Sequence, residues 1–269
     1  MTRLSGLSLA ALGFLELGPP ALIDVAAASG FSSVSLRTWA AVPGGPEYPL
    51  IEGGPVGLET RERLDATGVG IFQIEVVSLA RDVAIDSFRP VLEGGAALGA
   101  ERVVAAGDDD DPAVLVEQLA TLCDISADLG MSVDVEFMPF RRLATLSQAL
   151  DLVERVGRSN AHVMVDALHL FRSGGSPADV AAAAPERLGV CQLCDAPLAA
   201  PRRGDLAEEA RERRLPPGSG ELPLHDLVAA LPPDVRFAVE IPNELLFAGL
   251  SPVDRARVAF RSTSSLLQS

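Results

Sequence analysis

Apolar and polar positions along the chain repeat in units of about thirty residues. In each unit, a stretch with helical spacing of its apolar residues ends at a glycine or asparagine and passes directly into a short apolar run. Five such junctions lie at Gly30, Gly68, Gly99, Gly130 and Asn160, with separations of 38, 31, 31 and 30 residues. Glycine ends a helix readily because it adopts the left-handed conformation without steric cost. Short apolar runs are typical of strands covered on both faces, so the pattern predicts helices alternating with parallel strands.

Eight strands and eight helices can be placed on this pattern. We expect strands at residues 7–12, 32–37, 70–77, 101–106, 132–137, 161–166, 188–194 and 235–241. We expect helices at residues 19–29, 56–67, 88–99, 112–129, 145–157, 177–183, 222–231 and 251–267. These units predict an α/β protein: one domain over residues 1–269 folded as a (β/α)₈ TIM barrel, with its active site at the C-terminal ends of the strands. The alternative is an open doubly wound sheet, but no G-x-G-x-x-G follows the first strand.

Two connections, at residues 38–55 and 196–221, are too long to be plain turns. Both follow strands, so we expect both at the active-site end, as lids or substrate walls. The second contains five arginines, of which we expect Arg202 and Arg214 to bind an anionic or hydroxyl-rich substrate. Replacing Arg214 is then expected to raise KM and to leave metal binding intact. Alternatively, Arg211, Arg213 or Arg214 pairs with Glu208, Glu209 or Glu212 of the same segment at helical spacing.

Composition narrows the class of protein. Hydrophobic residues make up 48% of the chain and mean hydropathy is +0.26, which is sufficient for one large core. The formal net charge of −15 disfavours binding to nucleic acid or to anionic membrane surfaces. No apolar run reaches 18 residues, so no membrane span is expected. Three cysteines cannot form a disulfide framework and suit a reducing compartment, so we expect a cytoplasmic protein.

Polar side chains close the last four predicted strands. Glu136, Asp166, Gln192 and Glu240 each follow an apolar run, and in a barrel these four positions converge on one mouth. A carboxylate in an apolar setting is costly unless it is paired or binds a metal ion. Oxygen ligands favour Mn²⁺ or Mg²⁺, and Co²⁺ or Zn²⁺ could substitute. The alternative is that some of these groups form salt bridges with arginines of the long loop.

Three further residues are candidates for substrate contact. His169 lies three residues beyond Asp166, and we expect it to contact substrate or to act as an acid or base. Arg37 closes the second predicted strand and Glu75 closes the third, where each either faces the substrate or joins an ion pair. Asp195 is expected to support or cap the site rather than to act in it.

With this set of residues, the chain resembles the xylose isomerase-like TIM barrels, which are also described as sugar phosphate isomerases/epimerases and as the AP-endonuclease-2 superfamily. The segments that carry the resemblance are residues 135–139, 165–169, 192–197, 217–222 and 239–242. The resemblance implies metal ligands at Glu136, Asp166, Gln192 and Glu240. The third of these is a histidine in the epimerases, whereas glutamine is also seen in related bacterial 3-dehydroshikimate dehydratases.

The resemblance implies two neighbouring reactions on a small polyhydroxy ketone or sugar. An isomerase or epimerase would use Glu136 and Glu240 to move a proton next to a carbonyl through an enediolate. A dehydratase would instead expel a β-hydroxyl, with His169 or one glutamate as acid or base. A barrel without activity that serves as a binding module is the alternative from another class. The DNA-repair members are disfavoured because the chain has only three histidines. Assembly into a homo-oligomer stays open.

Overall fold

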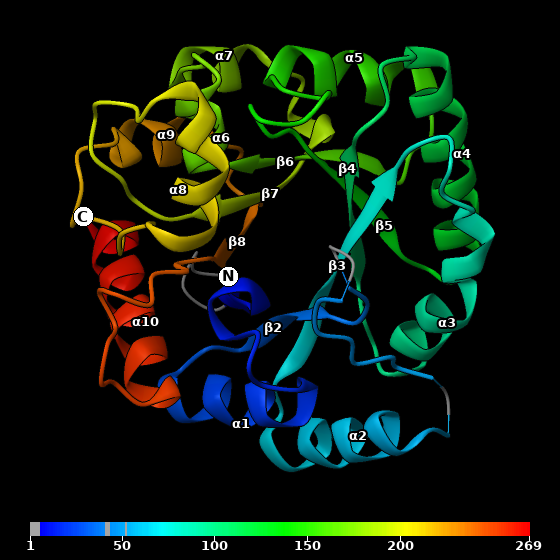
Figure 1. The fold of residues 1–269 in the computed structure, drawn as a ribbon, viewed down its shortest axis with the longest axis vertical. Helices are drawn as coiled ribbons and strands as arrows, with labels where there is room; N and C mark the ends of the chain where they lie inside the picture. The colour runs from blue at the N-terminus through cyan, green and yellow to red at the C-terminus, as the bar shows by residue number, and fades with distance from the viewer. Residues whose placement is uncertain (1–5, 41–43, 52) are drawn as a thin grey trace.

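Eight parallel strands close into a barrel in which each strand pairs with the next along the sequence and β8 pairs with β1 (Figure 1). The computed structural model describes residues 6–40, 44–51 and 53–269. The strands are β1 Ser8–Ala10, β2 Ser33–Arg37, β3 Gly70–Leu79, β4 Arg102–Gly107, β5 Ser132–Glu136, β6 Ala161–Asp166, β7 Leu188–Leu193 and β8 Arg236–Val239. The predicted TIM-barrel fold is confirmed.

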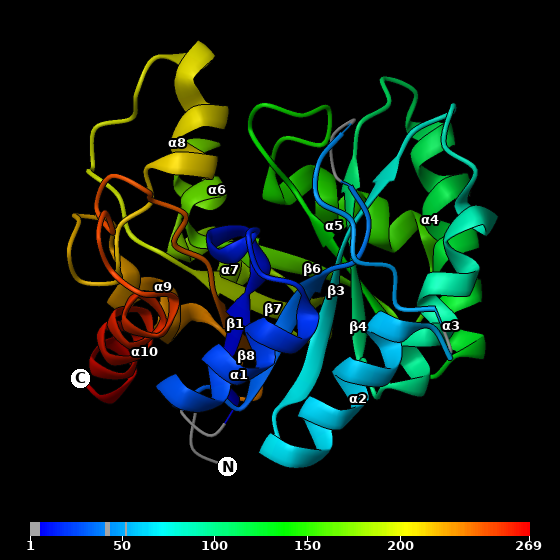
Figure 2. The same ribbon diagram turned by 60° about the horizontal axis from the view of Figure 1, so that its bottom comes forward.

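Helices surround this barrel. They are α1 Pro19–Ser29, α2 Pro55–Thr67, α3 Arg89–Ala97, α4 Pro112–Asp128, α5 Leu146–Val156, α6 Ala167–Arg172, α7 Pro177–Ala182, α8 Leu206–Glu212, α9 Leu224–Ala230 and α10 Pro252–Gln268. α6 and α8 were not expected from the sequence. Figure 2 shows α8 at the end of the barrel to which the strands point, opposite the N-terminus. None of the helices in the described part of the chain is long and apolar enough to cross a membrane.

Glycines end the helices largely as expected. Gly30 and Gly68 cap α1 and α2 in the left-handed conformation, with φ of 100° and 72°. The prediction that Asn160 ends a helix is wrong. Gly157 caps α5 with φ of 63°, and the Asn160 side chain instead donates hydrogen bonds to the carbonyls of Cys123 and Met131.

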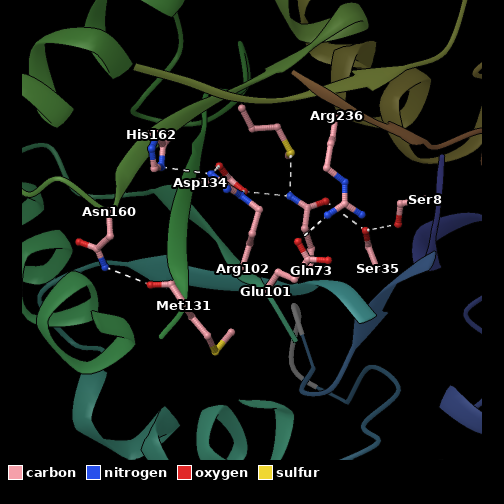
Figure 3. A network of polar contacts seen from close by, with 11 residues as sticks. Ser8, Ser35, Gln73, Glu101, Arg102, Met131, Asp134, Asn160, His162 and Arg236 are labelled. Carbon is pink, nitrogen blue, oxygen red and sulfur yellow. Dashed lines mark hydrogen bonds and ion pairs between the residues drawn. The ribbon is translucent and has the colours of Figure 1, made fainter. Parts of the chain in front are cut away.

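The barrel interior is layered from its N-terminal end upward. An ion pair lies at that end, where Arg102 of β4 donates to both carboxylate oxygens of Asp134 at 2.6 and 2.7 Å (Figure 3). Gln73 donates to the same carboxylate at 3.2 Å. Above this network lies an apolar layer that includes Val104 and Met164. These layers fill the lower barrel, which leaves the C-terminal end for a binding site.

Candidate active site

A pocket of about 220 Å³ opens at the C-terminal ends of the strands. Seven of the residues singled out from the sequence line it: Arg37, Glu75, Glu136, His169, Gln192, Arg214 and Glu240. Asp166 is fully buried and contacts two of these residues, His169 and Arg214. Arg202 does not line this pocket; it is exposed and directly precedes a short 3₁₀ turn at Arg203–Asp205. The expectation that Arg202 contacts the substrate therefore has no support in this geometry.

Asp166 and His169 are held together by the start of α6. Asp166 ends β6 and caps α6, where its Oδ1 accepts a hydrogen bond from the His169 backbone N–H at 2.9 Å. The three-residue spacing between them is that of an N-cap and the N3 position of a helix. The first turn of α6 thereby turns the His169 ring over the barrel mouth, where its Nε2 lies 3.6 Å from Glu136 Oε1.

These side chains form a group that could hold a metal ion. One ligand atom from each of Glu136, Asp166 and His169 lies within 4.8 Å of the others, and all three residues are buried. The His169 Nδ1 atom is buried and has no hydrogen-bond partner among the residues that the structure describes. From the sequence, we expected Gln192 and Glu240, rather than His169, to bind the ion together with Glu136 and Asp166. Gln192 and Glu240 line the same pocket.

Arg214 lies in the middle of this acidic cluster. Its side chain is 1% exposed, and its guanidinium contacts Asp166 Oδ2 at 2.5 Å and Glu240 Oε2 at 3.0 Å. Its Nε donates to the Ala210 carbonyl at 2.7 Å. The alternative that strand-end carboxylates form salt bridges with a loop arginine thus holds for two of the three, Asp166 and Glu240. Arg214 lines the pocket as expected, but it also contacts two proposed metal ligands, so these contacts do not support the expectation that its replacement leaves metal binding intact.

Burial and charge repulsion set the electrostatics of the cluster. Burial, followed by repulsion from Asp166 and Glu240, raises the pKa of Glu136 well above its ordinary value. Burial raises the pKa of Glu240 to about 7, although Arg214 opposes the shift. Burial lowers the pKa of His169 to about 4, so its ring is neutral at pH 7. For Asp166, burial is outweighed by Arg214 and His169, and its pKa is lowered.

The residues therefore fit a divalent cation. Gathering buried carboxylates with raised pKa values costs free energy that a cation would offset. A neutral imidazole with an unpartnered ring nitrogen is a competent ligand beside them. Arg214 offsets only part of this cost, since its two ion pairs are with Asp166 and Glu240 and not with Glu136.

Arg37 and Glu75 form an ion pair on the pocket wall. Arg37 Nη2 lies 3.7 Å from Glu75 Oε2, and both side chains are largely buried. Burial raises the pKa of Glu75 and Arg37 opposes the shift. The two expectations for these residues, an ion pair and a place in the pocket, are therefore met together.

The segment that carries Arg214 is fixed by a contact that the sequence did not reveal. Arg172 of α6 donates to both carboxylate oxygens of Glu209 of α8 at 2.7 Å, and it also donates to the Pro197 carbonyl. The two residues are 37 positions apart, so no local spacing indicates the pair. The alternative in which Glu209 pairs with an arginine of its own segment therefore does not hold.

Asp195 organises the end of the same loop. Its carboxylate accepts hydrogen bonds from the N–H groups of Gly218, Gly220 and Leu222. A Cβ at Gly220 would lie 2.4 Å from the Ala196 carbonyl oxygen, so the Pro-Gly-Ser-Gly turn needs glycine there. The interpretation of Asp195 as a supporting residue is confirmed.

Comparisons with known proteins agree with the barrel fold. The model of the family described as xylose isomerase-like TIM barrel matches residues 23–261. A 3-dehydroshikimate dehydratase of Pseudomonas aeruginosa is 32% identical over 143 residues, which are 53% of this chain and 22% of that protein. The chain thus spans well under half the length of that relative. An inosose isomerase of Bacillus licheniformis is 29% identical over 195 residues, 66% of this chain and 67% of that protein.

A solved structure extends the likeness over the whole barrel. The crystal structure of the IOLI protein, which has a zinc atom bound, superimposes with a TM-score of 0.81 and covers 98% of each chain. Its sequence identity with this chain is 18%, so this comparison establishes a shared fold.

Proposed function

The chain belongs to the xylose isomerase-like TIM barrel family, and from that premise we propose that it is a divalent-metal-dependent isomerase or epimerase of a small polyhydroxy ketone or sugar. The observation that carries the proposal is that two buried glutamates, Glu136 and Glu240, line the same pocket at the barrel mouth. Similarity to an inosose isomerase over two thirds of the chain supports it.

Glu136, Asp166, Gln192 and Glu240 would hold the ion, and the position of His169 makes it a further candidate ligand. A divalent cation bound there would polarise the carbonyl oxygen of the substrate and stabilise the charge of an enediolate. Carboxylate and amide oxygens favour Mn²⁺ or Mg²⁺, while a histidine ligand would also suit Co²⁺ or Zn²⁺.

The proton transfers belong to the two glutamates. One of them removes the proton from the carbon next to the carbonyl, and the other returns a proton to the adjacent carbon or to the opposite face. Arg214 holds the Glu240 carboxylate through its ion pair and limits the directions in which that base can point. The apolar wall, including Met138 and Met164, excludes water from the carbanion.

A second candidate is a metal-dependent dehydratase that shares the first proton abstraction and then loses a β-hydroxyl. The similarity to a 3-dehydroshikimate dehydratase favours it, as does the amide of Gln192 at a position where the epimerases have histidine. His169, beside Glu136, is placed to protonate the leaving hydroxyl.

Product analysis separates these functions. Keto-sugars, ketocyclitols and 3-dehydroshikimate are incubated with the chain and Mn²⁺; products are separated from the substrate by chromatography, and their masses are then measured. A product of unchanged mass supports an isomerase or epimerase, whereas a loss of 18 Da, that of water, supports the dehydratase. Failure of the metal-loaded chain to convert any of them would favour a binding module instead.

A further inference from the structure

Arg211 has a different environment from the other arginines of its segment. It lies in α8 and lines the pocket, with its guanidinium carbon 5.8 Å from the centre of the Phe140 ring. The Phe140 ring in turn packs edge-on against His169, with ring centres 5.4 Å apart. Within the described part of the chain, no carboxylate lies within 4.0 Å of the Arg211 guanidinium, whereas neighbouring Arg213 pairs with Glu208.

The net formal charge of the residues around the pocket becomes positive once a divalent metal ion is bound. Four arginines line the pocket, and four carboxylates line it or lie directly behind it; these residues are Arg37, Arg141, Arg211, Arg214, Glu75, Glu136, Glu240 and Asp166. Arg141 also has an outer partner, Asp108, at 3.1 Å. Four positive and four negative charges cancel, so a divalent ion brings the sum to +2, or to +1 when Asp108 is included.

We propose that the substrate carries a carboxylate and that Arg211 binds this group at the mouth of the pocket. This inference rests on the proposed function, because the surplus charge arises only with a bound divalent ion. A neutral sugar would leave the surplus uncompensated, whereas a carboxylate supplies one negative charge to Arg211, the one arginine of the pocket wall that has no carboxylate partner among the described residues. The planar fork of arginine binds a carboxylate through two parallel hydrogen bonds.

The size and surface of the pocket agree with a small carboxylate. A volume of about 220 Å³ is below that of pockets for drug-sized ligands, and it suits a ring or chain of few carbons. A phosphate group carries up to two negative charges and calls for a second unpaired cation, which the described pocket wall does not offer. Leu12, Leu15 and Met138 provide apolar wall for the carbon skeleton.

The test compares acids with their neutral methyl esters, which lack the negative charge and carry one more methyl group. Binding of shikimate and quinate to the Mg²⁺-loaded chain is measured by calorimetry beside their neutral methyl esters, with fructose 6-phosphate as the phosphate arm. We expect at least one acid to bind tenfold or more tightly than its ester. Arg211→Met should abolish that preference, and Arg211→Lys should retain part of it. Arg213→Met removes the same charge from an exposed residue outside the pocket and should change nothing.

Three outcomes would overturn the inference: equal affinity for every acid and its ester, equal effects of Arg211→Met and Arg213→Met, or tighter binding of the phosphate. The outcome for the proposed function is separate. If a neutral ketose is bound and converted, the inference fails and the proposed function stands. If the acids bind through Arg211 but no ketone is converted, the inference stands and the proposed function fails.

Discussion

Replacement of Arg214 by methionine tests the electrostatic account of the site. Methionine keeps an unbranched apolar stem but removes the guanidinium that contacts Asp166 at 2.5 Å and Glu240 at 3.0 Å. Removing one partner of a buried ion pair costs about 3–5 kcal/mol, because the other charge stays buried without compensation. For a chain of this size, each kcal/mol corresponds to about 2–4 °C in Tm, so we expect the metal-free variant to melt about 6–20 °C lower.

The same substitution should strengthen metal binding. Two unit charges about 4 Å apart interact by about 4 kcal/mol at an effective dielectric constant of 20, so the guanidinium opposes a cation bound to the same carboxylates. We therefore expect Arg214→Met to bind Mn²⁺ at least tenfold more tightly, and saturating Mn²⁺ to recover most of the lost Tm.

Calorimetry with and without chelator measures both effects, and Arg213→Met is the matched control because that arginine is exposed and outside the pocket. The reasoning is refuted if the metal-free Arg214→Met variant melts with the parent protein. It is also refuted if the variant binds Mn²⁺ more weakly.

Two further predictions concern buried polar groups, an ion pair and two thiols. Arg172→Met should lower the free energy of unfolding by about 3–5 kcal/mol, measured by urea denaturation. Adding Glu209→Leu should recover part of this loss, because no buried charge is then left unpaired. A double variant that is less stable than the single variant would contradict this. Burial raises the pKa of Cys123 and of Cys194 to about 12, so neither thiol should react with dithionitrobenzoate at pH 8 until the protein is unfolded, and rapid labelling of either one would argue against their burial.

The fold was accessible from the sequence because its signals are local. Helix-ending glycines such as Gly30 and Gly68 and the apolar runs after them repeat at a regular interval, and each is set by short-range conformational preference. The short helices α6 and α8 were missed, since six or seven residues give fewer than two full turns in which a periodic pattern could be recognised. Asn160 was misread because its role is a tertiary contact.

Most residues of the site could be predicted from the sequence, but few of the contacts between them could. A carboxylate that closes an apolar strand is a signal in the sequence itself, so Glu136, Asp166 and Glu240 could be placed at one mouth. The contact between Asp166 and Arg214 joins residues 48 positions apart. Of the five loop arginines, Arg211 and Arg214 line the pocket, and this depends on how the loop is packed. No rule of spacing supplies that choice, which is why Arg202 was also expected in the pocket.

The central claim is that this pocket removes a proton from the carbon next to a carbonyl with the help of a metal ion. Its most direct test is incubation of the Mn²⁺-loaded chain with polyhydroxy ketones in deuterated water, followed by mass spectrometry of the recovered ketone and its products. The account predicts deuterium on that carbon in at least one ketone, lost with a chelator and in Glu136→Gln or Glu240→Gln. Exchange that persists in the presence of chelator, or in both variants, or the lack of exchange with every ketone, would contradict it.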